Sequence, residues 1–183
     1  EISDNLTLDR AHYEEDLKRE QADHGQLHPH VAITLNSLGR SLKALGNIKD
    51  AIHYFQKALE IDEAVYGLRH PKVELRSCIL ADLLSELGGL SEARSYYRQA
   101  LSIIESIYGP RHIDAAVILN GLGKTAQAQG ELAEAREFFI RALAIYQSNM
   151  DANHPAAAIA GYHSRKQRSR QRAWPRAPEQ SLL

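Results

Sequence analysis

The chain has 183 residues, of which 44% are hydrophobic and 25% charged, and its formal net charge is −1. This balance is ordinary for a soluble domain with a buried core, and the apolar runs are too short to cross a bilayer. The first residues lack the pattern of a signal peptide, and the single cysteine, Cys78, can form no intrachain disulfide, so we expect a cytoplasmic protein.

A period of 42 residues runs through most of the chain. Histidines recur at His28, His70, His112 and His154, and proline follows three of them. Glycines, alanines and leucines recur at the same step, as does a set of aromatic residues: Phe55, Tyr97 and Phe139. So many coincident positions indicate a true internal repeat, which is the sequence signature of a solenoid.

In chain order, the period predicts a half repeat at residues 8–24, whole repeats at about 29–67, 71–109 and 113–150, and an incomplete repeat at 154–163. Each whole repeat contains two helical segments with apolar residues at steps of three and four. Proline suits the first position of a helix, and glycine suits its end. We therefore predict an all-α array over residues 1–163. Because residues 8–24 match only the second helix of a repeat, we also expect that the chain is part of a longer protein.

The spacing of recurring small and apolar residues within one repeat resembles that of a known family. Leu38-Gly39, Leu42, Ala51-x-x-x-Phe55 and Ala58 match the tetratricopeptide repeat, and the longer 42-residue form resembles the kinesin light chain subfamily. Two positions depart from the family pattern: Leu35, Ser77 and Leu119 replace its tryptophan, and Glu63, Glu105 and Gln147 replace its late proline. The resemblance implies a right-handed superhelical solenoid of antiparallel helix pairs, with the first helices lining a concave groove.

This resemblance implies a protein–protein interaction scaffold that binds a peptide or a partner helix, similar to the cargo-binding domain of kinesin light chains. Alternatives are a ligand-sensing repeat array within a larger nucleotide-switch signalling protein, a structural module that self-associates through its uncapped ends, and a nucleic-acid binder. The last would use the basic tail, residues 164–183, which has six basic side chains and one acidic one. We expect this tail to be a disordered extension and nucleic-acid binding to be the weaker alternative.

Residues that could carry chemistry show no catalytic or metal-binding pattern. His28 and His30 lie two residues apart, but no cysteine or carboxylate cluster joins them at ligand spacing. The repeating histidines are instead expected to cap the helices that follow them. Cys78 has no base beside it in the sequence. We therefore expect no enzyme activity, no cofactor and no metal.

The candidate binding residues follow from helical geometry. If Leu35, Leu38 and Leu42 face the core, the adjoining face of the first helices carries a repeated set of polar residues. These are Asn36, Arg40 and Lys43, then Cys78, Asp82 and Ser85, then Asn120, Lys124 and Gln127. In the family this face lines the groove, and the positions of Asn36 and Asn120 resemble its peptide-holding asparagines. The basic residues Arg40, Lys43 and Lys124 favour an acidic partner, an effect that Asp82 and Glu86 reduce.

Overall fold

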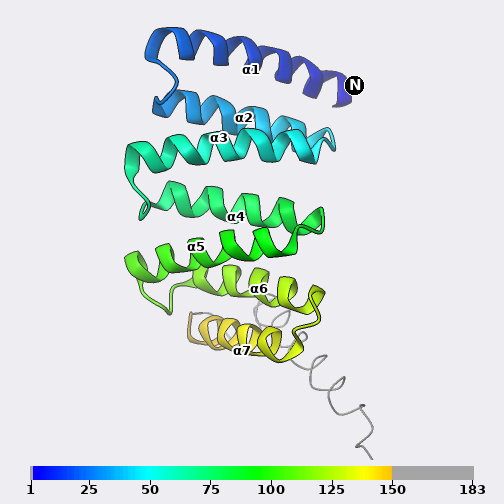
Figure 1. Cartoon of the computed structure of the whole chain (residues 1–183), viewed down its shortest axis with the longest axis vertical. Coiled ribbons are helices and arrows are strands. Elements are labelled where there is room, and N and C mark those ends of the chain that lie inside the picture. The colour runs from blue at the N-terminus through cyan, green and yellow to red at the C-terminus, as the bar shows by residue number, and fades with distance from the viewer. Residues whose placement is uncertain (1, 150–183) are drawn as a thin grey trace, which may run out of the picture.

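The structure, a computed structural model, describes residues 2–149, with side chains from Leu8 onward. This part of the chain is all-helical, and its seven helices succeed one another in a single stack (Figure 1). The helices are α1 (Ile2–His24), α2 (Pro29–Ala44), α3 (Ile48–Tyr66), α4 (Pro71–Glu86), α5 (Leu90–Tyr108), α6 (Ile113–Ala128) and α7 (Leu132–Asn149). The predicted incomplete repeat at 154–163 and the basic tail at 164–183 lie outside the described residues.

Local chemistry fixes where the first helices begin. His28, His70 and His112 have extended backbones, and the side chain of each accepts a hydrogen bond from the backbone N–H two residues on. The donor–acceptor distances are 3.3, 3.2 and 3.4 Å. This bond satisfies one of the donors that a helix N-terminus leaves free. The predicted capping role is therefore confirmed for these three histidines, and the fourth, His154, lies outside the described residues.

Glycines end the helices as predicted. Gly46, after α2, has a φ of +78°, and Gly67, after α3, has a φ of +80°. This left-handed conformation costs glycine little because it has no Cβ atom. The same turn recurs after each later helix up to α6, so the chain reverses direction at regular intervals.

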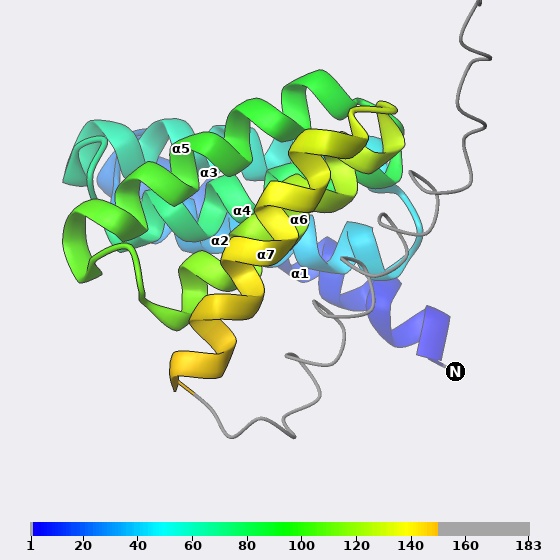
Figure 2. The same ribbon diagram turned by 90° about the horizontal axis from the view of Figure 1, so that it is seen from below.

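The helices pack as antiparallel pairs, α2 with α3, α4 with α5 and α6 with α7, and each pair packs on the next. α1 packs on α2 in the position of a second helix. Viewed along the stack, the later pairs are rotated relative to the earlier ones (Figure 2). The predicted solenoid of helix pairs is confirmed. None of the helices in the described range has both the length and the hydrophobicity that a membrane span needs.

Aromatic residues fill the space between paired helices. Phe55, Tyr97 and Phe139 are all buried, with exposed fractions of 1%, 6% and 0%. Gly39 lies against the ring of Phe55, and Gly123 lies against the ring of Phe139. Small residues thus sit where the helices approach most closely, as the sequence predicts.

The second helices of successive repeats are joined at a repeated position. Glu63 accepts a hydrogen bond from Gln99 at 2.9 Å, and Glu105 accepts one from Arg141 at the same distance. Both glutamates stand where the family pattern has its late proline. The substitution therefore has a structural role, since it supplies a bond between neighbouring repeats.

Candidate peptide-binding cleft

The candidate site lies on the polar face of the first helices, α2, α4 and α6. On α2, Leu35, Leu38 and Leu42 are buried, whereas Arg40 and Lys43 are exposed and Asn36 is half-buried. Equivalent residues on α4 and α6 follow at steps of 42, because each helix has the same place in its repeat. The fold therefore aligns the predicted residues in a row across three helices.

The middle of this row is an open cleft of about 550 Å³, which we call the central cleft. It combines the predicted face of the first helices with two tyrosines from the second helices. Its lining residues are Lys43, Asp82, Ser85, Glu86, Tyr97, Val117, Asn120, Gly121, Lys124 and Tyr146. Five of the nine residues predicted for this face line it, namely Lys43, Asp82, Ser85, Asn120 and Lys124.

The other four predicted residues lie elsewhere. Arg40 lines a separate, smaller hollow of about 270 Å³ next to Tyr13. The Asn36 Oδ1 atom accepts a hydrogen bond from Arg76 Nη1 at 2.6 Å, so this amide is already engaged within the array. Cys78 and Gln127 are half-buried and lie outside the central cleft.

Of the two predicted asparagines, Asn120 is the one that lines the central cleft. Its Nδ2 donates to the hydroxyl oxygen of Tyr146 at 3.3 Å, while its Oδ1 is buried and makes no hydrogen bond to any described residue. Turning the amide over would exchange the two atoms and leave N–H groups unmatched instead. An unpaired buried polar group costs about 1–3 kcal/mol, so this amide oxygen is a hydrogen-bond acceptor that the described residues leave unused.

The charges in the central cleft alternate along the stack. Lys43 on α2 and Lys124 on α6 are exposed, and α4 between them carries Asp82 and Glu86. Asp82 accepts a hydrogen bond from the Tyr97 hydroxyl. Burial, and after it this bond to Asp82, raises the pKa of Tyr97, so the phenol keeps its proton as a donor to the carboxylate.

Cys78 does not have the environment of a nucleophile. Its Sγ donates to Glu74 Oε1 at 3.2 Å. Burial raises the pKa of the Cys78 thiol well above its ordinary value, and the nearby carboxylates, Glu74 foremost, raise it further. Because the thiolate is the reactive form, this thiol is held in its unreactive state.

Sequence reasoning missed an apolar element of the same face. Ile33, Leu75 and Val117 are 52%, 53% and 58% exposed, and they occupy equivalent positions three residues before Asn36, Cys78 and Asn120. Val117 lines the central cleft. Their spacing of 42 residues was a visible signal, since an aliphatic residue recurring outside the core positions indicates a contact surface. Tyr97 and Tyr146 were missed for another reason, because they reach the cleft from the second helices.

This helical architecture matches that of a known protein family. A family model described as a tetratricopeptide repeat matches residues 10–71 and 74–160. A search of curated proteins gave no match.

Solved structures share the fold at low sequence identity. The TPR-like repeats of a candidate kinesin light chain from Podosopora anserina are 18% identical, with a TM-score of 0.79 over 92% of this chain and 81% of that one. BtubC (BKLC) from P. vanneervenii is 19% identical, with a TM-score of 0.73 over 98% and 79% of the two chains. The first TPR of Spaghetti (RPAP3), bound to the HSP90 peptide SRMEEVD, is 17% identical, with a TM-score of 0.60 over 81% and 98%.

Proposed function

The chain belongs to the tetratricopeptide repeat family, and from this premise we propose that its central cleft binds an extended peptide segment of a partner protein. Arrays of such repeats present long concave surfaces that serve as protein-interaction scaffolds. In this reading the chain is an adaptor without catalytic activity. The observation that carries the proposal is the cleft itself, which joins three first helices and is lined by Asn120.

The lining of the cleft suits the backbone of a peptide. The Asn120 amide and the Ser85 hydroxyl can each pair with a main-chain N–H or C=O group, whatever the ligand's side chains are. Val117 offers an exposed aliphatic surface beside them. Polar groups that fix the backbone, next to an apolar contact, are typical of sites for extended peptides.

The charges of the cleft suggest what the peptide carries. Lys43 and Lys124 attract acidic side chains at the two ends of the cleft, and the carboxylates of Asp82 and Glu86 favour a basic or donor group between them. The structurally similar array of Spaghetti holds the peptide SRMEEVD, which contains three acidic residues. We therefore propose a ligand with acidic residues on both sides of a neutral or basic one.

Selection from a random peptide display library tests this proposal. Peptides that bind the parent chain should be rich in acidic residues. The double variant Lys43→Glu with Lys124→Glu should bind them at least about tenfold more weakly, because two attractions become repulsions worth about 1.4 kcal/mol or more in total. Its residual binding should also depend less on salt concentration.

Two matched charge reversals serve as controls. Lys49→Glu changes an exposed lysine on α3 that does not line the cleft, and Arg40→Glu changes a residue on the same helix as Lys43 but in the separate hollow. Both should bind the selected peptides like the parent. If Arg40→Glu weakened binding as much as the double variant, the ligand would lie along α2 and the assignment to the central cleft would be wrong.

A further inference from the structure

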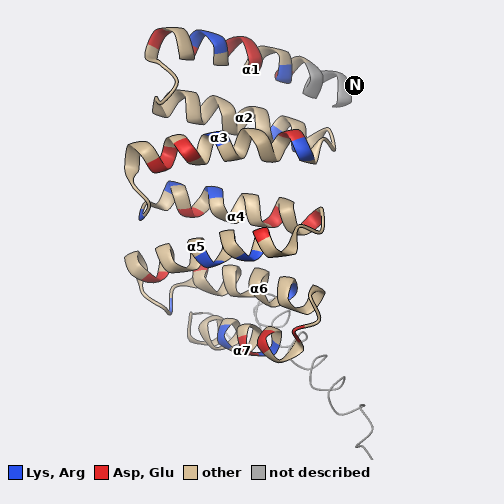
Figure 3. Cartoon of the chain, viewed as in Figure 1, with Lys and Arg blue, Asp and Glu red and all other residues tan. Residues whose placement is uncertain are grey.

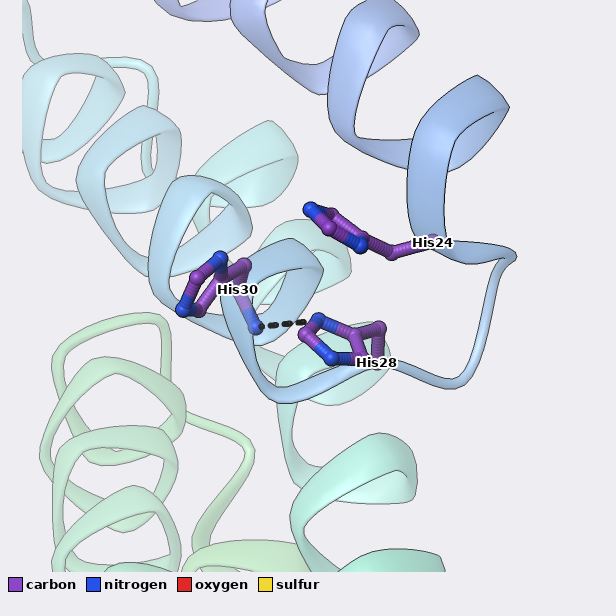
Figure 4. Close-up of side chains that lie close together, drawn as sticks. All are labelled: His24, His28 and His30. Carbon is purple, nitrogen blue, oxygen red and sulfur yellow. Dashed lines mark hydrogen bonds between the residues drawn. The ribbon is translucent and has the colours of Figure 1, made fainter.

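Three histidines converge at the link between α1 and α2. His24 is the last residue of α1, His28 caps α2, and His30 lies in its first turn (Figure 4). Each offers a ring nitrogen, and these atoms lie within 4.8 Å of one another. Sequence analysis predicted no metal site here, because it considered His28 and His30 alone and found no carboxylate at ligand spacing.

Two of these histidines are departures from the repeat. At the next two links the residue equivalent to His24 is a tyrosine, Tyr66 or Tyr108. Each tyrosine ring stacks on the capping histidine of its link, with distances between ring centroids of 4.5 and 4.7 Å. His24 stacks on His28 at 4.4 Å in the same way. The stack therefore needs an aromatic ring but no nitrogen, so packing alone does not explain a histidine at position 24.

The position of His30 supports the same reading. Its equivalents are Lys72 and Asp114, and at all three positions the backbone N–H donates to the cap, whatever the side chain is. The imidazole of His30 is thus not required by the cap. It is 59% exposed and turns toward the ring of His24, at a centroid distance of 5.5 Å.

A carboxylate completes the cluster from one turn earlier on α1. The Glu20 Oε2 atom lies 3.6 Å from His24 Nε2 and 3.5 Å from His30 Nδ1. This oxygen is buried and makes no hydrogen bond within the described part of the chain. A buried carboxylate oxygen without a donor, placed between two imidazoles, indicates a missing positive group.

We propose that Glu20, His24 and His30 bind a divalent transition-metal ion of the zinc class. Imidazole nitrogen and carboxylate oxygen are ordinary zinc ligands, at about 2.0–2.2 Å from the metal. Ligand atoms of a tetrahedral site are then about 3.4 Å apart, and the two separations that involve Glu20, 3.6 and 3.5 Å, are close to this value. The fourth position is open to water or to a group from a partner.

His28 is a positioning residue in this site. Its Nδ1 accepts the bond from the His30 backbone N–H, so in the neutral ring the other nitrogen carries the proton and cannot bind a metal. Its stacking on His24 holds that ring in place.

Metal binding would fasten α1 to α2, because Glu20 and His24 belong to one helix and His30 to the other. Isothermal titration of the metal-free, untagged chain with ZnCl₂ tests this directly. We expect one Zn²⁺ per chain and a rise in melting temperature on addition of Zn²⁺. Mg²⁺, which prefers oxygen ligands, should have no effect.

The repeat itself supplies the test variants. His24→Tyr and His30→Lys introduce the residues found at the next link, Tyr66 and Lys72, so the fold and the metal-free melting temperature should be unchanged. Each should weaken Zn²⁺ binding at least about tenfold, because even the loss of a residue that only orients a metal ligand can weaken binding that much. Glu20→Gln, which removes the charge but keeps the size, should weaken it similarly.

His12→Ala is the matched control, since His12 also lies on α1 beside a carboxylate, with its Nε2 3.3 Å from Asp16 Oδ2. It should bind Zn²⁺ like the parent. The proposal is wrong if the parent binds no Zn²⁺, if His24→Tyr and His30→Lys bind as tightly as the parent, or if His12→Ala loses as much affinity as they do.

Discussion

A buried ion pair joins the first whole repeat to the second. Arg76 Nε on α4 lies 3.1 Å from Asp62 Oδ2 on α3, and the two side chains are only 8% and 2% exposed. Burial raises the pKa of Asp62 and lowers that of Arg76, and in each case the opposite charge of the partner counteracts the effect. Arg76 also donates to Asn36 on α2, so a single guanidinium connects three helices.

One repeat later, the same two positions are apolar. Ile104 and Ile118 replace Asp62 and Arg76, and both are buried in one core cluster. We predict that Arg76→Ile alone lowers the free energy of unfolding by about 3–5 kcal/mol, because it leaves a buried charge unpaired. The double variant Asp62→Ile with Arg76→Ile should be as stable as the parent, or up to about 4 kcal/mol more stable. Urea unfolding measures both, and a double variant as unstable as the single one would contradict the argument.

The pair also explains why one predicted site residue could not be assigned from sequence. Asn36 and Asn120 are equivalent by period, and nothing near Asn36 in the sequence distinguishes them. The difference comes from Arg76, forty residues further on; the equivalent position for Asn120 is Ala160, which lies outside the described residues. A repeat pattern predicts where a side chain stands, but the contacts it makes depend on what the next repeat carries.

At the scale of the helices, the sequence predicts most of the fold. Prolines, capping histidines and positive-φ glycines are all local signals, and the apolar residues at steps of three and four identify the buried faces. The residues that the second helices contribute to the cleft could not be predicted from such local signals. Tyr97 was correctly expected in the core, yet its hydroxyl reaches Asp82 at the cleft because the ring packs beneath Gly121 of the following repeat.

The helix crossings give a matched pair of glycines. A Cβ atom built at Gly123 would lie 2.5 Å from the Phe139 ring, whereas one at Gly39 would lie 3.0 Å from the Phe55 ring. Alanine gains up to about 1 kcal/mol of helix propensity over glycine at either position. Overpacking typically costs about 1–3 kcal/mol and should be larger at the tighter crossing.

We therefore predict that Gly123→Ala is clearly destabilising and that Gly39→Ala is less so or neutral. Thermal unfolding followed by circular dichroism compares the two variants under identical conditions. Equal melting temperatures for the two variants would mean that the helices adjust freely at the crossing, contrary to the rigid packing inferred here.

At the scale of the whole array, α1 acts as a cover for the first core cluster. Leu17 packs against a group formed by α2 and α3: Val31, Ala32, Leu35, Ala58 and Ile61. The described part of α1 carries both acidic and basic residues (Figure 3). Among its described side chains, Leu8, at 72%, is the large apolar residue that stays exposed.

This packing changes what we expect of the array's N-terminal end. The sequence predicts concentration-dependent association through uncovered ends, but α1 packs Leu17 against the first core cluster, so little of that association should come from this end. A chain that begins at Leu27, without α1, would expose Val31, Ala32 and Leu35 to water. Exposed apolar patches of this kind promote association, and the lost interface should also lower the melting temperature, because neighbouring repeats supply much of a solenoid's stability. Multi-angle light scattering at matched concentrations should show larger species for the shortened chain than for the intact one. If both chains scatter alike and melt at the same temperature, α1 is not a cover, and the half repeat contributes nothing to the array.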